Sequence, residues 1–518
     1  MKTDVKLCCL VLLTTVVAAS QPSQDSLFVN GIVKEVGENS QVEVLAHELM
    51  DGVGPRLVGT PQMKKAHDWI MKKYESWGIA ARNEKWGEWR GWERGISHVD
   101  MIHPWVKTLQ AKSLAWSPGT HGKTISGEAI ILPEVRDSMG FIEWLPLVKG
   151  KFVMISMCQP TGRPDYNWTE FGTRQSVERM KANREKLSDA WQKRISNTRL
   201  NNKGLVRALE KAGAAGILAS HWSEGFGANK IFGAYTTKIP VVDISLEDYG
   251  LLFRLAESGQ RPGINLRVDS RELGMVPTFN TLGEIRGTEF PDEYVMLSAH
   301  LDSWDGATGA TDNGTGTIVM MEAMRLLKKL YPNPKRTILV GHWGGEEQGL
   351  NGSRSFVEDH PEIVEKIQAL FNQDNGTGRV VSLSGQGFLN AYEYLSRWLA
   401  AVPAQVKDQI STLYPGMPGS GGSDYASFVA VGVPAFSLSS LSWSYGTYTW
   451  HTNLDTYDKI VFDDLKNNVI LTAVLAYKAS EDPHRASMEK ALLPLNPSTG
   501  EREPWPGQKP AMRRGGLD

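Results

Sequence analysis

Cysteine is scarce in this chain, and the scarcity excludes a disulfide-based fold. Only three cysteines occur among 518 residues, and two of them, Cys8 and Cys9, lie near the start. If the N-terminal segment is removed, only Cys158 is left and no internal disulfide can form. The chain is also too long for one ordinary domain, so more than one is expected.

The sequence also lacks a charge surplus and a long apolar run. It has 56 basic and 58 acidic residues, a net charge of −2, so neither nucleic acid nor an anionic membrane is an expected partner. No stretch is long and apolar enough for a membrane span. A composition of 41% hydrophobic and 22% charged residues is typical of a soluble globular protein.

The N-terminus has the pattern of a secretory signal peptide. Lys2 and Lys6 precede the apolar run Leu7–Ala19, which is too short to cross a bilayer. Small residues then lead to a cleavage site near Ser20 and Gln21. Residues 1–20 are therefore predicted to be removed, and the protein to be secreted or periplasmic.

Past this segment the composition changes three times. Residues 21–120 combine a turn-rich stretch, a helical pattern and alternating strands. Residues 121–272 contain short apolar strands and a charge-rich helical segment, Arg174–Ser196, that we expect to be solvated. Strands and helices alternate through 273–484. Residues 485–518 are proline-rich and poor in apolar residues, which predicts an extended tail.

The most informative feature is a series of His, Asp and Glu residues in glycine-rich turns. Apolar strands lead into it: Tyr294–Ala299 ends at His300, and Ile367–Phe371 runs toward Asp374. In open α/β sheets, sites lie beyond the carboxyl ends of the strands. The motifs are S-A-H-L-D (298–302), G-A-T-D-N-G-T-G (309–316), G-G-E-E-Q-G-L-N-G-S (344–353), N-Q-D-N-G (372–376) and W-H-T-N-L-D-T-Y-D (450–458).

These residue types suit a zinc site that hydrolyses an amide bond. Zinc binds imidazole and carboxylate, and a catalytic zinc keeps a position for water. Asp312, short and flanked by glycines, is the natural bridge between two ions. Asp302 is placed to accept the spare N–H of His300. In the pair Glu346 and Glu347, one carboxylate can bind metal while the other takes a proton from water.

In this order the motifs resemble those of the co-catalytic dizinc exopeptidases, which include bacterial leucyl aminopeptidases, carboxypeptidase Q and glutamate carboxypeptidase. The resemblance covers most of residues 43–480. It implies an α/β fold with a mixed, mostly parallel sheet flanked by helices. It also implies an inserted, mainly-β protease-associated domain at 121–272, with the catalytic domain in two parts, 21–120 and 273–484.

The resemblance further implies two zinc ions and a division of roles. Glu346 would be the general base, acting on the water between the metals, and Asp302 would orient His300. The bond Asp312–Asn313 would be a cis peptide. One zinc would be held by His300, Asp312 and Asp374, and the second by Asp312, Glu347 and His451.

The expected function is a secreted exopeptidase acting on peptides, with aminopeptidase activity favoured. No arginine occurs between Arg397 and Arg485 to clamp substrate carboxylates, although Arg379 or the inserted domain could supply a cation. The alternative is a dipeptidase or carboxypeptidase similar to carboxypeptidase Q. A non-catalytic receptor-like relative would have lost ligands, and none is lost. The sequence leaves a homodimer open.

Overall fold

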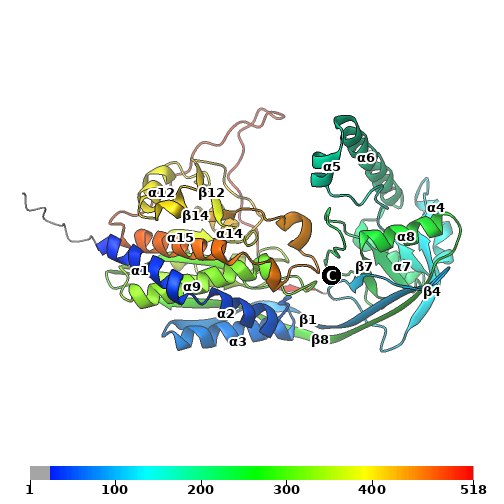
Figure 1. Cartoon of the computed structure of the whole chain (residues 1–518), viewed down its shortest axis with the longest axis horizontal. Helices are drawn as coiled ribbons and strands as arrows, with labels where there is room; N and C mark the ends of the chain where they lie inside the picture. The colour runs from blue at the N-terminus through cyan, green and yellow to red at the C-terminus, as the bar shows by residue number, and fades with distance from the viewer. Residues whose placement is uncertain (1–23, 517–518) are drawn as a thin grey trace, which may run out of the picture.

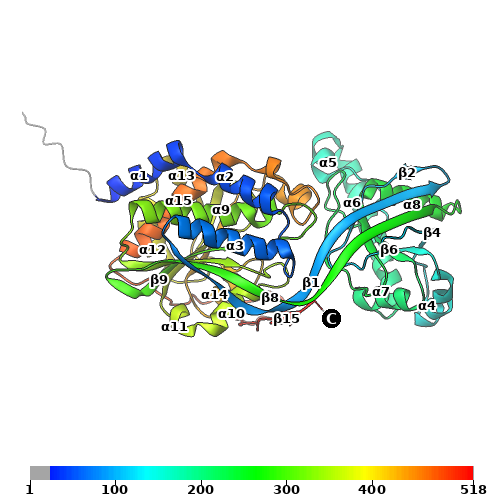
Figure 2. The same cartoon turned by 90° about the horizontal axis from the view of Figure 1, so that it is seen from below.

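The computed structural model describes residues 24–516. The predicted signal peptide and its cleavage site lie outside the described residues. Within the described part, no helix combines the length and apolar character needed to cross a membrane. The chain forms two lobes joined by a pair of long strands (Figures 1 and 2).

The first lobe is built on a mixed, mostly parallel sheet, as the sequence predicts. β9 (Phe290–His300) is hydrogen-bonded to β10 (Arg336–Trp343) on one side and to β11 (Ile367–Asn372) on the other, both in parallel. The sheet continues from β11 through β14 (Ala435–Ser440), β12 (Val380–Ser384) and β13 (Ser411–Leu413).

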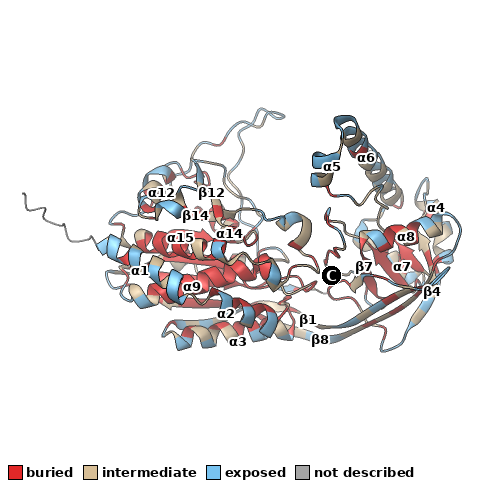
Figure 3. Ribbon diagram, in the orientation of Figure 1, coloured by how far each residue is buried: buried red, intermediate tan, exposed pale blue. Residues whose placement is uncertain are grey.

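Helices cover both faces of this sheet because side chains alternate along each strand. In β9, Val295 and Leu297 pack into one apolar cluster with α9 and α15, whereas Met296 packs into another with α10 and α14. Both clusters are fully enclosed, and α9 and α15 are the most extensively buried helices (Figure 3). The helices of the first cluster are α1 (Gln24–Asn39), α2 (Val42–Ala46), α3 (Pro61–Ser76), α9 (Thr315–Leu330), α12 (Ala391–Ala400), α13 (Ala404–Lys407) and α15 (Phe462–Glu481). Those of the second are α10 (Asn351–Asp359), α11 (Pro361–Val364) and α14 (Tyr425–Ala430).

Two long antiparallel strands, β1 (Ala80–His103) and β8 (Gly263–Ile285), connect the lobes (Figure 2). Their pairing runs from Ala80 opposite Glu284 to His103 opposite Gly263, with register shifts that bend the ribbon. β8 pairs with β10 in the first lobe and with β4 in the second. The second lobe therefore begins inside a strand rather than at residue 121.

The second lobe contains the strands and helices expected between residues 121 and 272, with more helix than a mainly-β domain. Its strands β4, β5, β6 and β7 are parallel neighbours. The charge-rich helix α6 is solvated as predicted, with only Met180 buried. The protease-associated assignment stays a prediction. Elements of this lobe are β2 (Lys107–Thr108), β3 (Ala111–Ser113), β4 (Ile125–Ile131), α4 (Ser138–Trp144), β5 (Phe152–Met154), α5 (Asp165–Phe171), α6 (Arg174–Asn197), α7 (Asn202–Lys211), β6 (Gly216–Ala219), β7 (Val241–Ile244) and α8 (Leu246–Glu257).

The C-terminal segment is extended, as predicted, and returns across the first lobe. Its last described strand, β15 (Arg514–Gly515), pairs in parallel with β1 at Glu88 and Trp89. The Arg513 guanidinium forms ion pairs of 2.7 and 2.8 Å with Glu358 and Asp359 at the end of α10. The tail thus connects α10 to β1, one of the two strands that join the lobes.

Candidate metal centre

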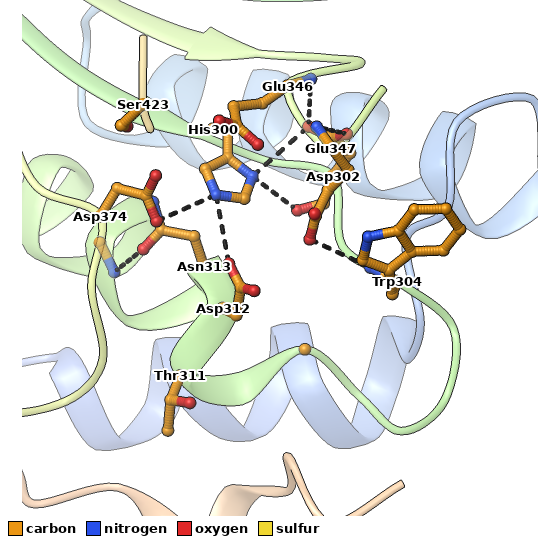
Figure 4. Close-up of polar contacts among 12 residues, drawn as sticks. His300, Asp302, Trp304, Thr311, Asp312, Asn313, Glu346, Glu347, Asp374 and Ser423 are labelled. Atoms are coloured by element: carbon orange, nitrogen blue, oxygen red, sulfur yellow. Dashed lines mark hydrogen bonds and ion pairs between the residues drawn. The ribbon is translucent and has the colours of Figure 1, made fainter. Parts of the chain in front are cut away.

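The sequence-predicted ligands meet at one edge of the sheet because their strands are neighbours. His300 is the last residue of β9, Glu346 and Glu347 lie in the turn after β10, and Asp374 follows β11. Asp312 lies in the turn Ala310–Gly314 directly before α9, where its own backbone is non-helical (φ −129°, ψ 91°). Figure 4 shows His300 between Asp302, Asp312 and Asp374.

Asp312 presents one carboxylate oxygen to each of two imidazoles. His300 Nε2 lies 3.4 Å from Asp312 Oδ1 and 3.1 Å from Asp374 Oδ1. His451 Nε2 lies 3.3 Å from Asp312 Oδ2 and 3.0 Å from Glu347 Oε2. The structure therefore forms two three-residue groups that share Asp312, and in each group the ligand atoms lie within 4.8 Å of one another.

The donor atoms fit zinc. Neighbouring ligands of a tetrahedral zinc with bonds of about 2.0–2.1 Å lie about 3.3 Å apart, and the four distances above are 3.0–3.4 Å. Asp312 Oδ2 is buried and has no hydrogen-bond partner among the described residues, although buried polar atoms are normally satisfied. The Asp312–Asn313 peptide is cis, as the family resemblance implies.

The pKa shifts of these residues indicate that the site holds more negative than positive charge. Burial raises the pKa of Glu346 and of Glu347 well above the usual range. Burial alone would lower the pKa of His300, but nearby carboxylates, Asp374 first, raise it well above its usual value. Burial opposes ionisation of Asp312 as well, yet the hydrogen bond from His300 lowers its pKa. Bound divalent cations would relieve this competition.

Asp302 contacts the glutamate turn as well as His300, whereas the sequence predicts only the contact with His300. His300 Nδ1 lies 3.0 Å from the Asp302 backbone carbonyl, and the carboxylate oxygen is farther away, at 3.5 Å. The carboxylate accepts the backbone N–H groups of Glu346 and Glu347, both at 3.2 Å. Asp302 thus positions the imidazole through its carbonyl and the glutamate turn through its side chain.

Asp455 holds the turn that carries Asp312. Its carboxylate accepts the backbone N–H of Thr311 at 2.7 Å and of Asp312 at 3.0 Å. Asp455 belongs to neither three-residue group and orients the site through these two backbone contacts. Burial raises the pKa of Asp455 to about 7, against the effect of these hydrogen bonds.

Arg56 is a supporting residue that sequence reasoning missed. Its side chain is fully buried and donates to the backbone carbonyls of Leu301, Gly54, Thr308 and Gly309 at 2.7–3.1 Å. Burial lowers its pKa to about 10, so it stays charged at neutral pH. The guanidinium fixes the loop between the first ligand, His300, and Asp312. The motif G-P-R-L-V-G-T-P indicated a turn but not this contact.

The second lobe completes one wall of the site. The ring of Phe232, from that lobe, lies 5.2 Å from the His451 ring and 5.7 Å from the Trp304 ring, measured between centroids. Trp450 packs against His451 at 4.1 Å. Sequence analysis did not predict a contact between the inserted segment and a ligand, because nothing near Phe232 in the sequence resembles a site motif.

Three other side chains near the motifs differ in what they contact. The Tyr445 phenol lies near enough to Asp312 to help lower the pKa of that carboxylate, so it reaches the site. The Tyr448 hydroxyl instead lies 3.1 Å from that of Tyr166, in the second lobe. His342 is buried, and its Nε2 lies 2.6 Å from the Tyr74 hydroxyl, away from the ligands.

Comparison with known proteins places this site in a family. The model of peptidase family M28 matches residues 280–476. The chain is also 26% identical to carboxypeptidase Q of Rattus norvegicus over 441 residues, 84% of each chain, and 26% identical to the Homo sapiens protein over 459 residues, 88% of each. Residues 280–476 are thus similar to peptidase family M28, as the site motifs predict. The protein is a hydrolase of the metallopeptidase class, with zinc as the implied metal.

Solved structures show the same fold. An M28 peptidase precursor from Shewanella amazonensis superposes with a TM-score of 0.66 at 24% identity, covering 91% of this peptidase and 99% of that chain. A zinc aminopeptidase from Bacillus subtilis gives 0.55 at 19% identity, covering 87% and 97%. Since both alignments extend across most of each chain, the two-lobed arrangement has counterparts in these structures.

Replacing Arg56 by Met should damage both stability and metal binding. Four carbonyls would lose a charged donor in a buried place, so we expect the unfolding free energy to fall on the order of 3 kcal/mol and zinc affinity to fall with it. Denaturant unfolding and metal titration measure the two effects. Arg174→Met, on the solvated helix α6, is the control and should change stability by less than about 0.5 kcal/mol. Unchanged stability and zinc affinity in the Arg56 variant would contradict the assigned role.

Proposed function

We propose that this peptidase is a dizinc exopeptidase that hydrolyses a terminal peptide bond. The observation that carries the proposal is the Asp312 carboxylate, which turns one oxygen to His300 and the other to His451. One zinc would be held by His300, Asp312 and Asp374, and the second by Asp312, Glu347 and His451. When bound, the two ions would polarise the scissile carbonyl and acidify water.

Glu346 is proposed as the general base. It belongs to neither three-residue group, yet its backbone is fixed by Asp302 next to the ligand Glu347. A carboxylate in this place takes the proton of the attacking water and then gives it to the departing amine. Asp302 is a positioning residue, since it acts through His300 and the glutamate turn.

Tyr445 is proposed to stabilise the negative charge that develops on the scissile carbonyl oxygen. Its phenol reaches Asp312 and is buried among the site's carboxylates, which raises its pKa well above the usual value. It therefore stays a hydroxyl donor at neutral pH, as such a role requires.

Charged groups around the site decide whether the enzyme recognises the amino or the carboxyl terminus of its substrate. The aminopeptidase preference rests on the lack of arginine, and Arg379 indeed pairs with Asp464 at 3.4 Å instead of facing the ligands. The second lobe, however, brings a lysine, Lys230, to the Trp450 beside His451. Together with the similarity to carboxypeptidase Q, this lysine supports our proposal of a dipeptidase or carboxypeptidase over the aminopeptidase that the sequence favours.

We also propose that the protein is secreted or periplasmic, on the basis of the N-terminal pattern of charged, apolar and small residues. The residues that carry this pattern lie outside the described part of the chain.

Glu346→Gln should abolish most turnover without displacing metal. The amide keeps the shape of the side chain but cannot collect a proton, so kcat should fall about 10²- to 10⁴-fold. Zinc content should stay at two ions per chain by elemental analysis of the purified protein. Glu362→Gln, with an exposed side chain on α11, is the control and should keep wild-type kcat. Full turnover in a zinc-loaded Glu346→Gln protein would refute the assignment.

Blocking each end of one dipeptide should identify the recognised terminus. We expect the free dipeptide to be hydrolysed, its C-terminal amide to be hydrolysed far more slowly, and a chelator to stop both reactions. Initial rates by chromatography of the released amino acid measure this. If N-acetylation alone stopped hydrolysis and amidation had no effect, the enzyme would be an aminopeptidase.

A further inference from the structure

Lys230 is held beside the metal centre by the backbone of the second lobe. It lies between β6 and β7 and forms an antiparallel bridge with Thr452, the residue after the ligand His451. On either side, the Ile231 N–H donates to the His451 carbonyl at 2.8 Å, and the Asn229 N–H donates to Asn453 Oδ1 at 2.7 Å. The position of this lysine is therefore coupled to that of the last ligand.

Lys230 is a largely buried residue whose ammonium has no counter-ion. The residue is 9% exposed, and no carboxylate or hydrogen-bond acceptor in residues 24–516 contacts its Nζ. The ammonium instead lies over the Trp450 ring, whose centroid is 3.9 Å away. Burying an uncompensated charge costs free energy, and a cation–π contact recovers only part of that cost.

A half-buried lysine provides the contrast. Lys112, in β3, also lies where the lobes meet, but its ammonium donates to the Gly306 carbonyl. Its hydrogen-bonding capacity is thus used within the protein. Lys230 has no such acceptor, which leaves its ammonium available to an incoming anion.

The position of the ammonium suits a group one residue away from the scissile bond. Trp450 contacts both Lys230 and His451, with its ring 4.1 Å from the imidazole. Because both contacts are made to the same Trp450 ring, the ammonium lies at most about 8 Å from the His451 ring. One residue of peptide spans at most about 3.6 Å, so an α-carboxylate on the residue just after the scissile bond falls within this range.

We propose that Lys230 binds the free α-carboxylate of the residue released by hydrolysis, with Trp450 as the platform that holds the ammonium in place. The inference rests on the proposed function and narrows its substrates to dipeptides and to peptides cleaved at the last bond. Lys230 is a specificity-determining residue in this assignment, because it discriminates a carboxylate from an amide.

The competing explanation is a purely structural one, in which the cation–π contact only joins the lobes. The two explanations differ in what a substitution does to two matched substrates. Loss of a carboxylate partner affects only the substrate with a free carboxylate. Loss of a contact between lobes disturbs the site for both substrates alike.

The test uses the full-length, zinc-loaded enzyme and two substrates, a dipeptide and its C-terminal amide. Lys230→Met should lower kcat/KM for the free dipeptide about 10- to 100-fold, mainly through KM. For the amide, kcat/KM should stay within about twofold. Lys230→Arg should restore most of the activity toward the free dipeptide. Lys238→Met, at an exposed position of the same lobe, should leave both substrates unaffected.

Two results would overturn the assignment of Lys230 alone: equal losses on the acid and the amide in Lys230→Met, or a wild-type enzyme that hydrolyses the acid and the amide equally well. A wild-type enzyme that carries two zinc ions and hydrolyses neither compound would instead overturn the proposed function, and the assignment with it.

Discussion

The geometry of the site depends on the shared carboxylate of Asp312. One oxygen faces His300, at the end of the central strand, and the other faces His451, in a loop about 150 residues after His300. Both oxygens are placed correctly only if the backbone of the turn is rigid. Asp455 supplies part of that rigidity by accepting two consecutive N–H groups, from Thr311 and Asp312. Asp455 follows His451 by four residues, so the same hydrogen bonds also hold His451 close to Asp312 and His300.

Around this turn, the loop after His300 is fixed from several directions. Arg56 binds four of the nearby carbonyls from the first lobe. From β1, Arg94 forms a two-pronged pair with Asp305, both distances being 2.7 Å. Such bidentate pairs combine energy with geometric specificity. The loop therefore has a defined position relative to both lobes, and the ligands before and after it keep their mutual distances.

Much of the site could be predicted from the sequence because its ligands are local features. His300 ends an apolar strand and Asp374 follows another, so pattern and turn residues suffice to place them. Arg56 could not be predicted, since it contacts Leu301 across 245 positions of sequence and its neighbours indicate only a turn. The role of Asp302 was predicted only in part, because its carboxylate accepts the backbone N–H groups of Glu346 and Glu347. Phe232 and Lys230 depend on how the second lobe docks, which no local pattern encodes.

In the proposed function, this docking separates the groups that react from the groups that select the substrate. The five proposed ligands and Glu346 all belong to the first lobe, where they lie in turns and loops at one edge of the parallel sheet or at the end of β9. The second lobe contributes Phe232 against His451 and Lys230 against Trp450, and it is carried by the continuous pair β1 and β8. If Lys230 binds a substrate carboxylate as proposed, a substitution in the loop between β6 and β7 alters which peptide end is bound without moving a proposed ligand. A change in the bend of β1 and β8 would act differently, because the Ile231–His451 hydrogen bond would transmit it to the metal site. Under this proposal, substrate choice varies with the residues of that loop, whereas the angle between the lobes is constrained because the position of His451 depends on it.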